Sequence, residues 1–155
     1  MLLRGGHVLV AKQRKPVRLI EFGPPGDGAH GFSPGSALGR DESFELAGDG
    51  TVEMDVMASW KVDHDDVKSI NDLSVGDDGR LHVVSSKSRS LARVEADLEP
   101  GGGKARLATY ELPDDLFHTD DDKAEGLVFT PELGWLVGLD LKRSAPNVFQ
   151  VTGVP

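Results

Sequence analysis

The sequence predicts an all-β protein, and three observations support that prediction. The chain has 155 residues, and its 19 Gly and 9 Pro leave no long stretch with the apolar period of a helix. Between these breaks, short runs rich in Val, Leu and aromatic residues alternate with polar residues, as in half-buried antiparallel sheet. Parts of the sequence also repeat. We expect one domain over residues 1–155, an incomplete β-propeller of antiparallel four-stranded blades, with a β-sandwich as the alternative.

The expected strands follow one another with turns between them. Gly48-Asp49-Gly50 and Asp77-Asp78-Gly79 supply residues that tolerate tight hairpin turns. Residues 23–42 form an irregular insertion, because their Pro and Gly residues cannot pair as a central strand. Residues 99–104 (Glu-Pro-Gly-Gly-Gly-Lys) are expected to be a flexible connector. The strands are expected at residues 7–11, 17–22, 51–62, 70–75, 80–85, 90–95, 105–112, 126–129, 135–139 and 147–151.

Internal repetition determines the predicted architecture. Gly6–Glu21 aligns without a gap on Arg80–Glu95, each as a strand, a basic turn and a second strand, and Gly134–Arg143 begins a third copy. The repeating unit is a four-stranded meander, complete in blade 2 (about 69–112) and partial in blade 1 (about 5–62) and blade 3 (about 123–152). Propellers close with about four to eight blades. We therefore expect a homo-oligomer or part of a larger propeller, because exposed terminal blades leave unpaired edges in water.

Composition disfavours several classes of partner. Lys and Arg number 17 against 26 Asp and Glu, and the net charge of −9 disfavours nucleic acid, which requires a cationic surface. The absence of Cys excludes disulfides, thiolate zinc sites and cysteine nucleophiles. Apolar runs fall far below the roughly 20 residues that cross a bilayer, so we expect no membrane partner. With no targeting segment in view, a cytoplasmic location is the default expectation.

Three stretches of the sequence have the form of propeller blade signatures. They are Leu9–Phe22, Asn71-Asp72-Leu73 before Asp78-Gly79-Arg80-Leu81, and Lys123-Ala124-Glu125-Gly126-Leu127. At these residues the chain resembles the esterase-like, phytase-type β-propeller family, over most of its length outside residues 23–42. The resemblance implies a calcium-favouring channel and hydrolysis of phosphate or other ester substrates. The chain departs from the family in having fewer blades.

Acidic residues and histidine gather in the connections between repeat units. In a meander these connections emerge on the same side as the turns between the second and third strands, which defines a candidate ligand face. Each connection leads to a first-strand position, Asn71 or Glu125, that faces the axis of a propeller. Oxygen-rich groups without Cys favour hard cations such as Ca²⁺, although ordinary solvated turns are the alternative. The predicted calcium ligands are Asp66, Asp120 and Glu125, and the candidate catalytic residues are His64, His118 and Glu125.

The turns between the second and third strands carry the opposite charge. Their basic residues are Lys12, Arg14, Lys15, Lys87, Arg89, Lys142 and Arg143. Lys15, Arg89 and Arg143 occupy equivalent positions in the aligned repeats. Together with Asn71 they are the predicted ligand-binding residues, because a ring of cations suits a small anionic ligand such as a phosphate or carboxylate. The alternative is that these cations only keep the hairpin turns soluble.

Two other features are not predicted to form sites. Gly31–Gly35 fits the Gly-x-Ser-x-Gly pattern of hydrolases, but Pro34 follows Ser33 and has no N–H to donate to an oxyanion. His7 and His82 occupy nearly the same column of the second strand. We expect both to face solvent or to pack between blades.

The predicted function is a β-propeller-type binding scaffold whose loops bind a metal or a small anionic ligand. The alternative is a calcium-assisted hydrolase, in which bound Ca²⁺ polarises a phosphate or ester and His118 or His64 moves protons. A third possibility is a non-functional remnant of a longer gene.

Overall fold

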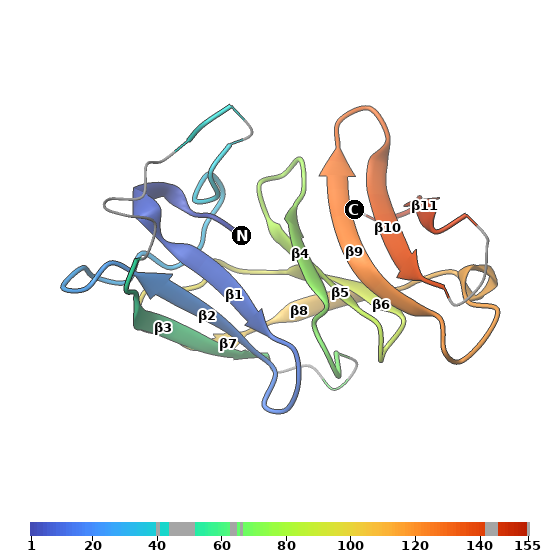
Figure 1. Ribbon diagram of the computed structural model, residues 1–155, viewed down its shortest axis with the longest axis horizontal. Helices are drawn as coiled ribbons and strands as arrows, with labels where there is room; N and C mark the ends of the chain where they lie inside the picture. Colours follow the sequence, from blue (N-terminus) through green and yellow to red (C-terminus); the bar gives the residue numbers. More distant parts are fainter. Residues whose placement is uncertain (40, 44–51, 63–64, 66, 142–145, 155) are drawn as a thin grey trace.

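The chain folds into strands that form three sheets (Figure 1). The computed structural model describes residues 1–39, 41–43, 52–62, 65, 67–141 and 146–154. Helical turns in these residues are limited to the three-residue 3₁₀ segments η1 (Arg4–Gly6) and η2 (Asp114–Leu116). No helix in the described part of the chain is long and apolar enough to span a membrane. The all-β prediction is confirmed.

The first sheet contains β1 (Val8–Lys12), β2 (Arg18–Gly23), β3 (Asp55–Val62) and β7 (Gly103–Ala105), in that order. Its strands are antiparallel except that β7 runs parallel to β3. The prediction of a flexible connector over residues 99–104 was therefore wrong for Gly103 and Lys104, which belong to β7. A Cβ at Gly102 would lie 2.8 Å from the Ser59 carbonyl oxygen, so glycine lets the connector approach β3 closely enough to pair.

The second sheet is the complete meander that the repeat predicted. Its strands are β4 (Asp72–Val75), β5 (Leu81–Ser85), β6 (Ser90–Val94) and β8 (Leu107–Glu111), antiparallel and in that order. All five residues of β5 are buried. The expectation of half-buried sheet is wrong for this strand, because other sheets cover both of its faces.

The third sheet contains β9 (Lys123–Thr130), β10 (Gly134–Asp140) and β11 (Val148–Val151), with β10 in the middle. Figure 1 shows the three sheets following one another across the molecule, with the second between the others. Two apolar cores fill the two interfaces. Side chains alternate along β5, so Leu81 and Val83 join the core with the first sheet and Val84 joins the core with the third. The described residues thus form three sheets, whereas the sandwich alternative has two.

The first strands of the second and third sheets lie side by side. The Asp72 carboxylate accepts a hydrogen bond from the Leu127 N–H at 2.9 Å, and the Ser74 hydroxyl accepts one from the Phe129 N–H at 3.2 Å. Side-chain oxygens of β4 thereby satisfy backbone donors on the outer edge of β9. The segment before β1 also extends the first sheet, because Met1 exchanges two backbone hydrogen bonds with Leu9. Burial lowers the pKa of the Met1 ammonium, while the Asp72 carboxylate acts to raise it.

Candidate functional site

An open groove with a mostly basic lining lies between the first and second sheets, and we call it the basic groove. Three chain segments meet there: the β1–β2 turn, the end of β3 with the connection that follows it, and the β5–β6 turn. The lining residues are Arg14, Lys15, Pro16, Val17, Lys61, Val62, Asp65, Val67, Lys68 and Lys87. The connection and the two turns therefore share one face, as the meander predicted.

Hydrogen bonds from backbone N–H groups hold these segments together. The Val62 N–H donates to the Val17 carbonyl at 3.1 Å, which joins the end of β3 to the start of β2. The Lys68 N–H donates to the Ser88 hydroxyl at 3.0 Å, and the Lys87 N–H donates to the Ser69 hydroxyl at 3.3 Å. The groove floor is thus positioned by reciprocal bonds between the connection and the β5–β6 turn, while the charged side chains above it remain exposed.

Among the described residues, the charges in the basic groove are strongly unbalanced. The described cations that line it are Arg14, Lys15, Lys61, Lys68 and Lys87, and the one described carboxylate is Asp65. None of these five cations forms an ion pair among the described residues, whereas arginines elsewhere do: Arg4 pairs with Glu42, Arg80 with Asp97 and Arg89 with Asp120. In a chain of net charge −9, unpaired cations gathered at one place create a local field that attracts anions.

The predicted ligand-binding residues Lys15 and Arg89 lie in two different places. Lys15 lines the basic groove, but Arg89 lines a smaller groove with Glu111 and Asp114. The Arg89 guanidinium lies 3.2 Å from the Asp120 carboxylate and 4.8 Å from the centre of the Phe117 ring. One predicted anion-binding residue therefore pairs with one predicted calcium ligand. Lys87, which precedes Arg89 by two residues in the β5–β6 turn, lines the basic groove together with Lys15.

The structure also brings Asn71 and Glu125 together. The Asn71 side-chain amide donates to the Glu125 carboxylate at 2.9 Å, and the Asn71 side-chain oxygen accepts bonds from Ser69 and from the Ser86 N–H. This pair bridges the second and third sheets beside the β4–β9 junction. Among the described residues, neither Asp120 nor Glu125 belongs to a group of three or more histidines or carboxylates at metal-ligand spacing.

The remaining predicted residues are exposed or lie outside the described ranges. His118 is exposed, and its backbone N–H donates to the buried Asp122 carboxylate, which also binds the N–H and hydroxyl of Thr119. His64, Asp66 and Arg143 lie outside the described residues. The calcium set of Asp66, Asp120 and Glu125 and the catalytic roles of His64, His118 and Glu125 stay predictions.

A second cluster, which we call the histidine–carboxylate cluster, consists of His7, Glu21, Asp27 and His30. Glu21 Oε1 lies 2.6 Å from His7 Nδ1, and Asp27 Oδ2 lies 3.2 Å from His7 Nε2. The imidazole rings of His7 and His30 stack with centroids 3.9 Å apart. Ligand atoms of His7, Glu21 and His30 all lie within 4.8 Å of one another. His7, which was expected to face solvent or to pack between blades, is instead fully buried among these polar partners.

Glu21 holds the cluster together from the inside of the fold. It is fully buried on the face of β2 that also buries Leu19 and Gly23. Its carboxylate accepts bonds from the backbone N–H groups of His30 and Gly31 at 2.8 and 2.9 Å, besides its contact with His7. The loop after β2 is thereby folded back over His7. The hydrogen bonds from His7 and the Gly28 N–H lower the pKa of Asp27 at the exposed end.

One sequence signal for this cluster was present. In β2, Glu21 occupies a position whose alternating neighbours Leu19 and Gly23 are buried. A carboxylate on an apolar face must find partners, because burying an unpaired charge is very costly. The partners themselves could not be deduced, because Asp27 and His30 lie in the irregular insertion. His82, by contrast, packs between sheets against Trp135 at 4.3 Å, as one of the two expectations for it stated.

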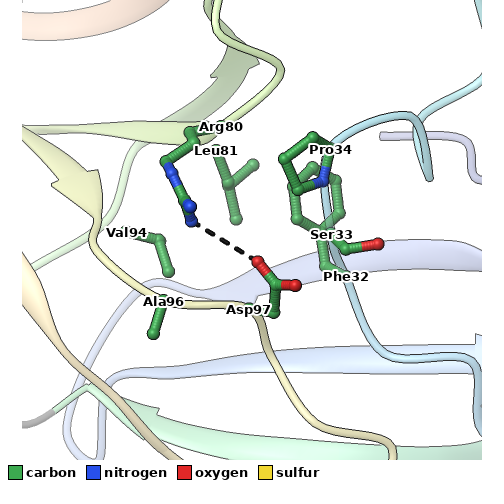
Figure 2. A pocket seen from close by; sticks show the side chains of 8 residues that line it. All are labelled: Phe32, Ser33, Pro34, Arg80, Leu81, Val94, Ala96 and Asp97. Atoms are coloured by element: carbon green, nitrogen blue, oxygen red, sulfur yellow. Dashed lines mark hydrogen bonds and ion pairs between the residues drawn. The ribbon is translucent and has the colours of Figure 1, made fainter.

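The Gly-x-Ser-x-Gly match has no catalytic setting. The Ser33 hydroxyl lies 3.3 Å from the Ser36 hydroxyl, and Figure 2 shows it pointing away from the Arg80–Asp97 pair that borders a small pocket. The pocket is lined by Phe32, Ser33, Pro34, Arg80, Leu81, Val94, Ala96 and Asp97. No histidine is among these residues, so the pocket offers no imidazole base for Ser33.

Comparison with known proteins gives no match. No protein-family model matches the chain, and no curated protein or solved structure shows significant similarity to it.

Proposed function

We propose that the chain is a partial β-propeller that serves as a binding scaffold for a small anionic ligand in the basic groove. The observation that supports this proposal best is the set of five cations around the groove, none of which is paired with a carboxylate among the described residues. A surface that only needed solubility would not require such cations to be gathered from three separate segments of an acidic chain. Charge-assisted bonds to phosphate or carboxylate groups are the interactions that such a groove favours.

The propeller part of the proposal is supported by the order of the sheets. Each interface between successive sheets holds its own apolar core, and the first strands β4 and β9 are adjacent. In a propeller, blades pack face to face around an axis that their first strands line. Three sheets do not close such a ring. We therefore also propose that a second copy, or further blades, completes the assembly.

The ligand is expected to be small and to carry more than one anionic group. Lys15 and Lys87 come from turns of different sheets, so two anionic groups on one molecule can bind both. A long polyanion would extend onto the acidic remainder of the surface and be repelled. Pyrophosphate and citrate are suitable probes of this class.

The calcium-assisted hydrolase receives less support from the contacts. Glu125 is bonded to Asn71 and Asp120 is paired with Arg89, so both predicted ligands already have partners. Binding of Ca²⁺ at these residues would have to displace those partners. Hydrolysis stays a prediction that rests on the family resemblance.

Isothermal titration calorimetry with pyrophosphate tests the proposed binding. The wild-type chain should bind pyrophosphate saturably, and the affinity should fall as salt is added, because salt screens exposed charges. Lys15→Glu/Lys87→Glu should weaken binding at least about ten-fold, which corresponds to about 1.4 kcal/mol. The substituted side chains are exposed, so the fold should survive.

The matched control replaces an exposed lysine elsewhere. Lys123→Glu introduces a charge reversal on β9, outside the basic groove, and should leave the affinity within about two-fold of wild type. Absence of saturable binding to the wild-type chain, or equal weakening by Lys123→Glu, would contradict the proposed binding site.

A further inference from the structure

The histidine–carboxylate cluster has the donor chemistry of a transition-metal site. His7, Glu21 and His30 place two imidazole nitrogens and a carboxylate oxygen within 4.8 Å of one another. Two histidines and one carboxylate are a ligand set that Zn²⁺ uses when one position stays open to solvent. Calcium prefers oxygen ligands, so this set selects a different class of ion from the one that the acidic loops suggest.

The surroundings of His7 resemble those of a metal-ligating histidine. One ring nitrogen, Nδ1, faces Glu21, and the other, Nε2, faces the Asp27 carboxylate at 3.2 Å. A metal-bound histidine usually donates its second ring N–H to a carboxylate or carbonyl, which fixes the tautomer and the ring orientation. Asp27 is placed to accept this bond when Nδ1 binds the metal.

Glu21 retains capacity for a further contact. An ionised carboxylate offers about four lone-pair sites. Glu21 uses sites for the N–H groups of His30 and Gly31, and these contacts do not involve the His7 ring. Replacement of the His7–Glu21 hydrogen bond by a metal ion therefore leaves both backbone bonds in place, and the loop remains attached to β2.

The required movement is small. Two ligands at 2.0–2.1 Å from a tetrahedral Zn²⁺ are separated by about 3.3 Å. His7 Nδ1 and Glu21 Oε1 lie 2.6 Å apart, so they must separate by roughly 0.7 Å to admit the ion. The His30 ring, which stacks on His7 at an interplanar angle of 15°, must turn its nitrogen toward the ion. His30 is exposed at the mouth of the cluster.

The cluster is both rigid at its base and open at its mouth. His7 and Glu21 are fully buried, whereas Asp27 and His30 are exposed. A Cβ at Gly23 would lie 2.6 Å from the His7 ring, so the backbone packs directly against that imidazole. The Phe32 N–H and Leu98 carbonyl, bonded at 2.9 Å, fix the far end of the loop. Because the base is rigid and the rim is exposed, an ion can reach the ligand atoms, and only the small movements described above are needed to bind it.

We propose that this cluster binds one divalent transition-metal ion of the Zn²⁺ class, with His7, Glu21 and His30 as ligands and Asp27 as the partner of His7 Nε2. The site is separate from the basic groove and does not depend on the proposed function. Water completes the coordination, as in zinc sites with three protein ligands.

The test is calorimetric titration of the full chain with Zn²⁺ alone, followed by thermal unfolding with and without the ion. We expect one Zn²⁺ per chain and a rise in Tm, because an ion that binds only the folded state stabilises it. His30→Ala should weaken Zn²⁺ binding at least about ten-fold while leaving the Tm of the metal-free chain nearly unchanged, because His30 is exposed. Excess Ca²⁺ should not displace the Zn²⁺.

His118→Ala is the matched control, because it removes an exposed histidine from an acidic loop of the other half of the chain. It should leave Zn²⁺ affinity unchanged. Co²⁺ bound to the wild-type chain should give a tetrahedral visible absorption spectrum that His30→Ala loses. The proposal is overturned if the wild-type chain shows no saturable Zn²⁺ binding, if His30→Ala binds like wild type, or if His118→Ala abolishes binding. In the first two cases the cluster is a hydrogen-bond network only.

Discussion

At the scale of single residues, the buried Glu21 is expected to have a large effect on stability. Its carboxylate is fully buried and accepts bonds from His7 and from two backbone N–H groups. Glu21→Ala leaves those donors without an acceptor, and breaking a buried charged network of this kind costs about 3–5 kcal/mol. Denaturant unfolding monitored by Trp fluorescence measures this loss. Glu21→Gln keeps one acceptor oxygen and should cost less, and a loss below about 1 kcal/mol for Glu21→Ala would contradict the assigned role.

The exposed pair Arg4–Glu42 allows a pH prediction. The Arg4 guanidinium at 2.8 Å and the Gly39 N–H lower the pKa of Glu42. A lowered folded-state pKa means that the contribution to stability is present above the ordinary Glu pKa and is lost as the pH falls through the folded-state value. NMR titration of the Glu42 carboxyl should show a pKa below the ordinary value that rises in Arg4→Met. An unchanged Glu42 pKa in Arg4→Met would show that the pair does not persist in solution.

At the scale of elements, the junction between β4 and β9 depends on side chains. The Asp72 carboxylate and the Ser74 hydroxyl accept the N–H groups of Leu127 and Phe129, which point away from β10. Asp72→Ala should speed hydrogen exchange of the Leu127 amide and its neighbours in β9, while amides of β2 stay protected. Ser74→Ala removes the longer of the two bonds and should have the smaller effect. Equal protection of Leu127 in Asp72→Ala and wild type would mean that apolar packing alone holds the sheets together.

The elements also show how far the sequence could predict the fold. The strand positions and the meander of the second sheet follow from local alternation and from the alignment of residues 6–21 on 80–95, so both could be read from the sequence. The strand β7 could not be read from the sequence. It pairs with β3, which is far from it in the sequence, and the Gly-rich segment that contains β7 lacks the residue pattern of a strand. The complete burial of β5 depends on two neighbouring sheets, which local alternation does not reveal.

The candidate sites, like the fold, could be predicted from the sequence only in part. Repeat logic placed Lys15 and Lys87 in equivalent turns of one face, and both line the basic groove. It also placed Asn71 and Glu125 at matching first-strand positions, and their side chains are in contact. It could not foresee that Arg89 would pair with Asp120, since that contact depends on the path of a loop. The His7 cluster depends on the irregular insertion, whose conformation no local pattern specifies.

At the scale of the whole molecule, the three sheets do not close into a ring. If the chain is a partial propeller, copies should associate until the exposed edge strands are paired. Light scattering over a range of concentrations should then give a single species of twice the chain mass. A stable monomer at all concentrations would argue against an open propeller that completes itself with a second copy.

NMR mapping during a pyrophosphate titration tests directly whether the basic groove binds a small anion. We expect saturable shifts of the amides of Val17, Val62, Lys68 and Ser88, which lie on the segments that form the basic groove. Amides of β10, in the third sheet, should not move. Binding in the basic groove is ruled out if no amide shifts saturably, or if the shifted amides cluster around His118 and Asp120 instead.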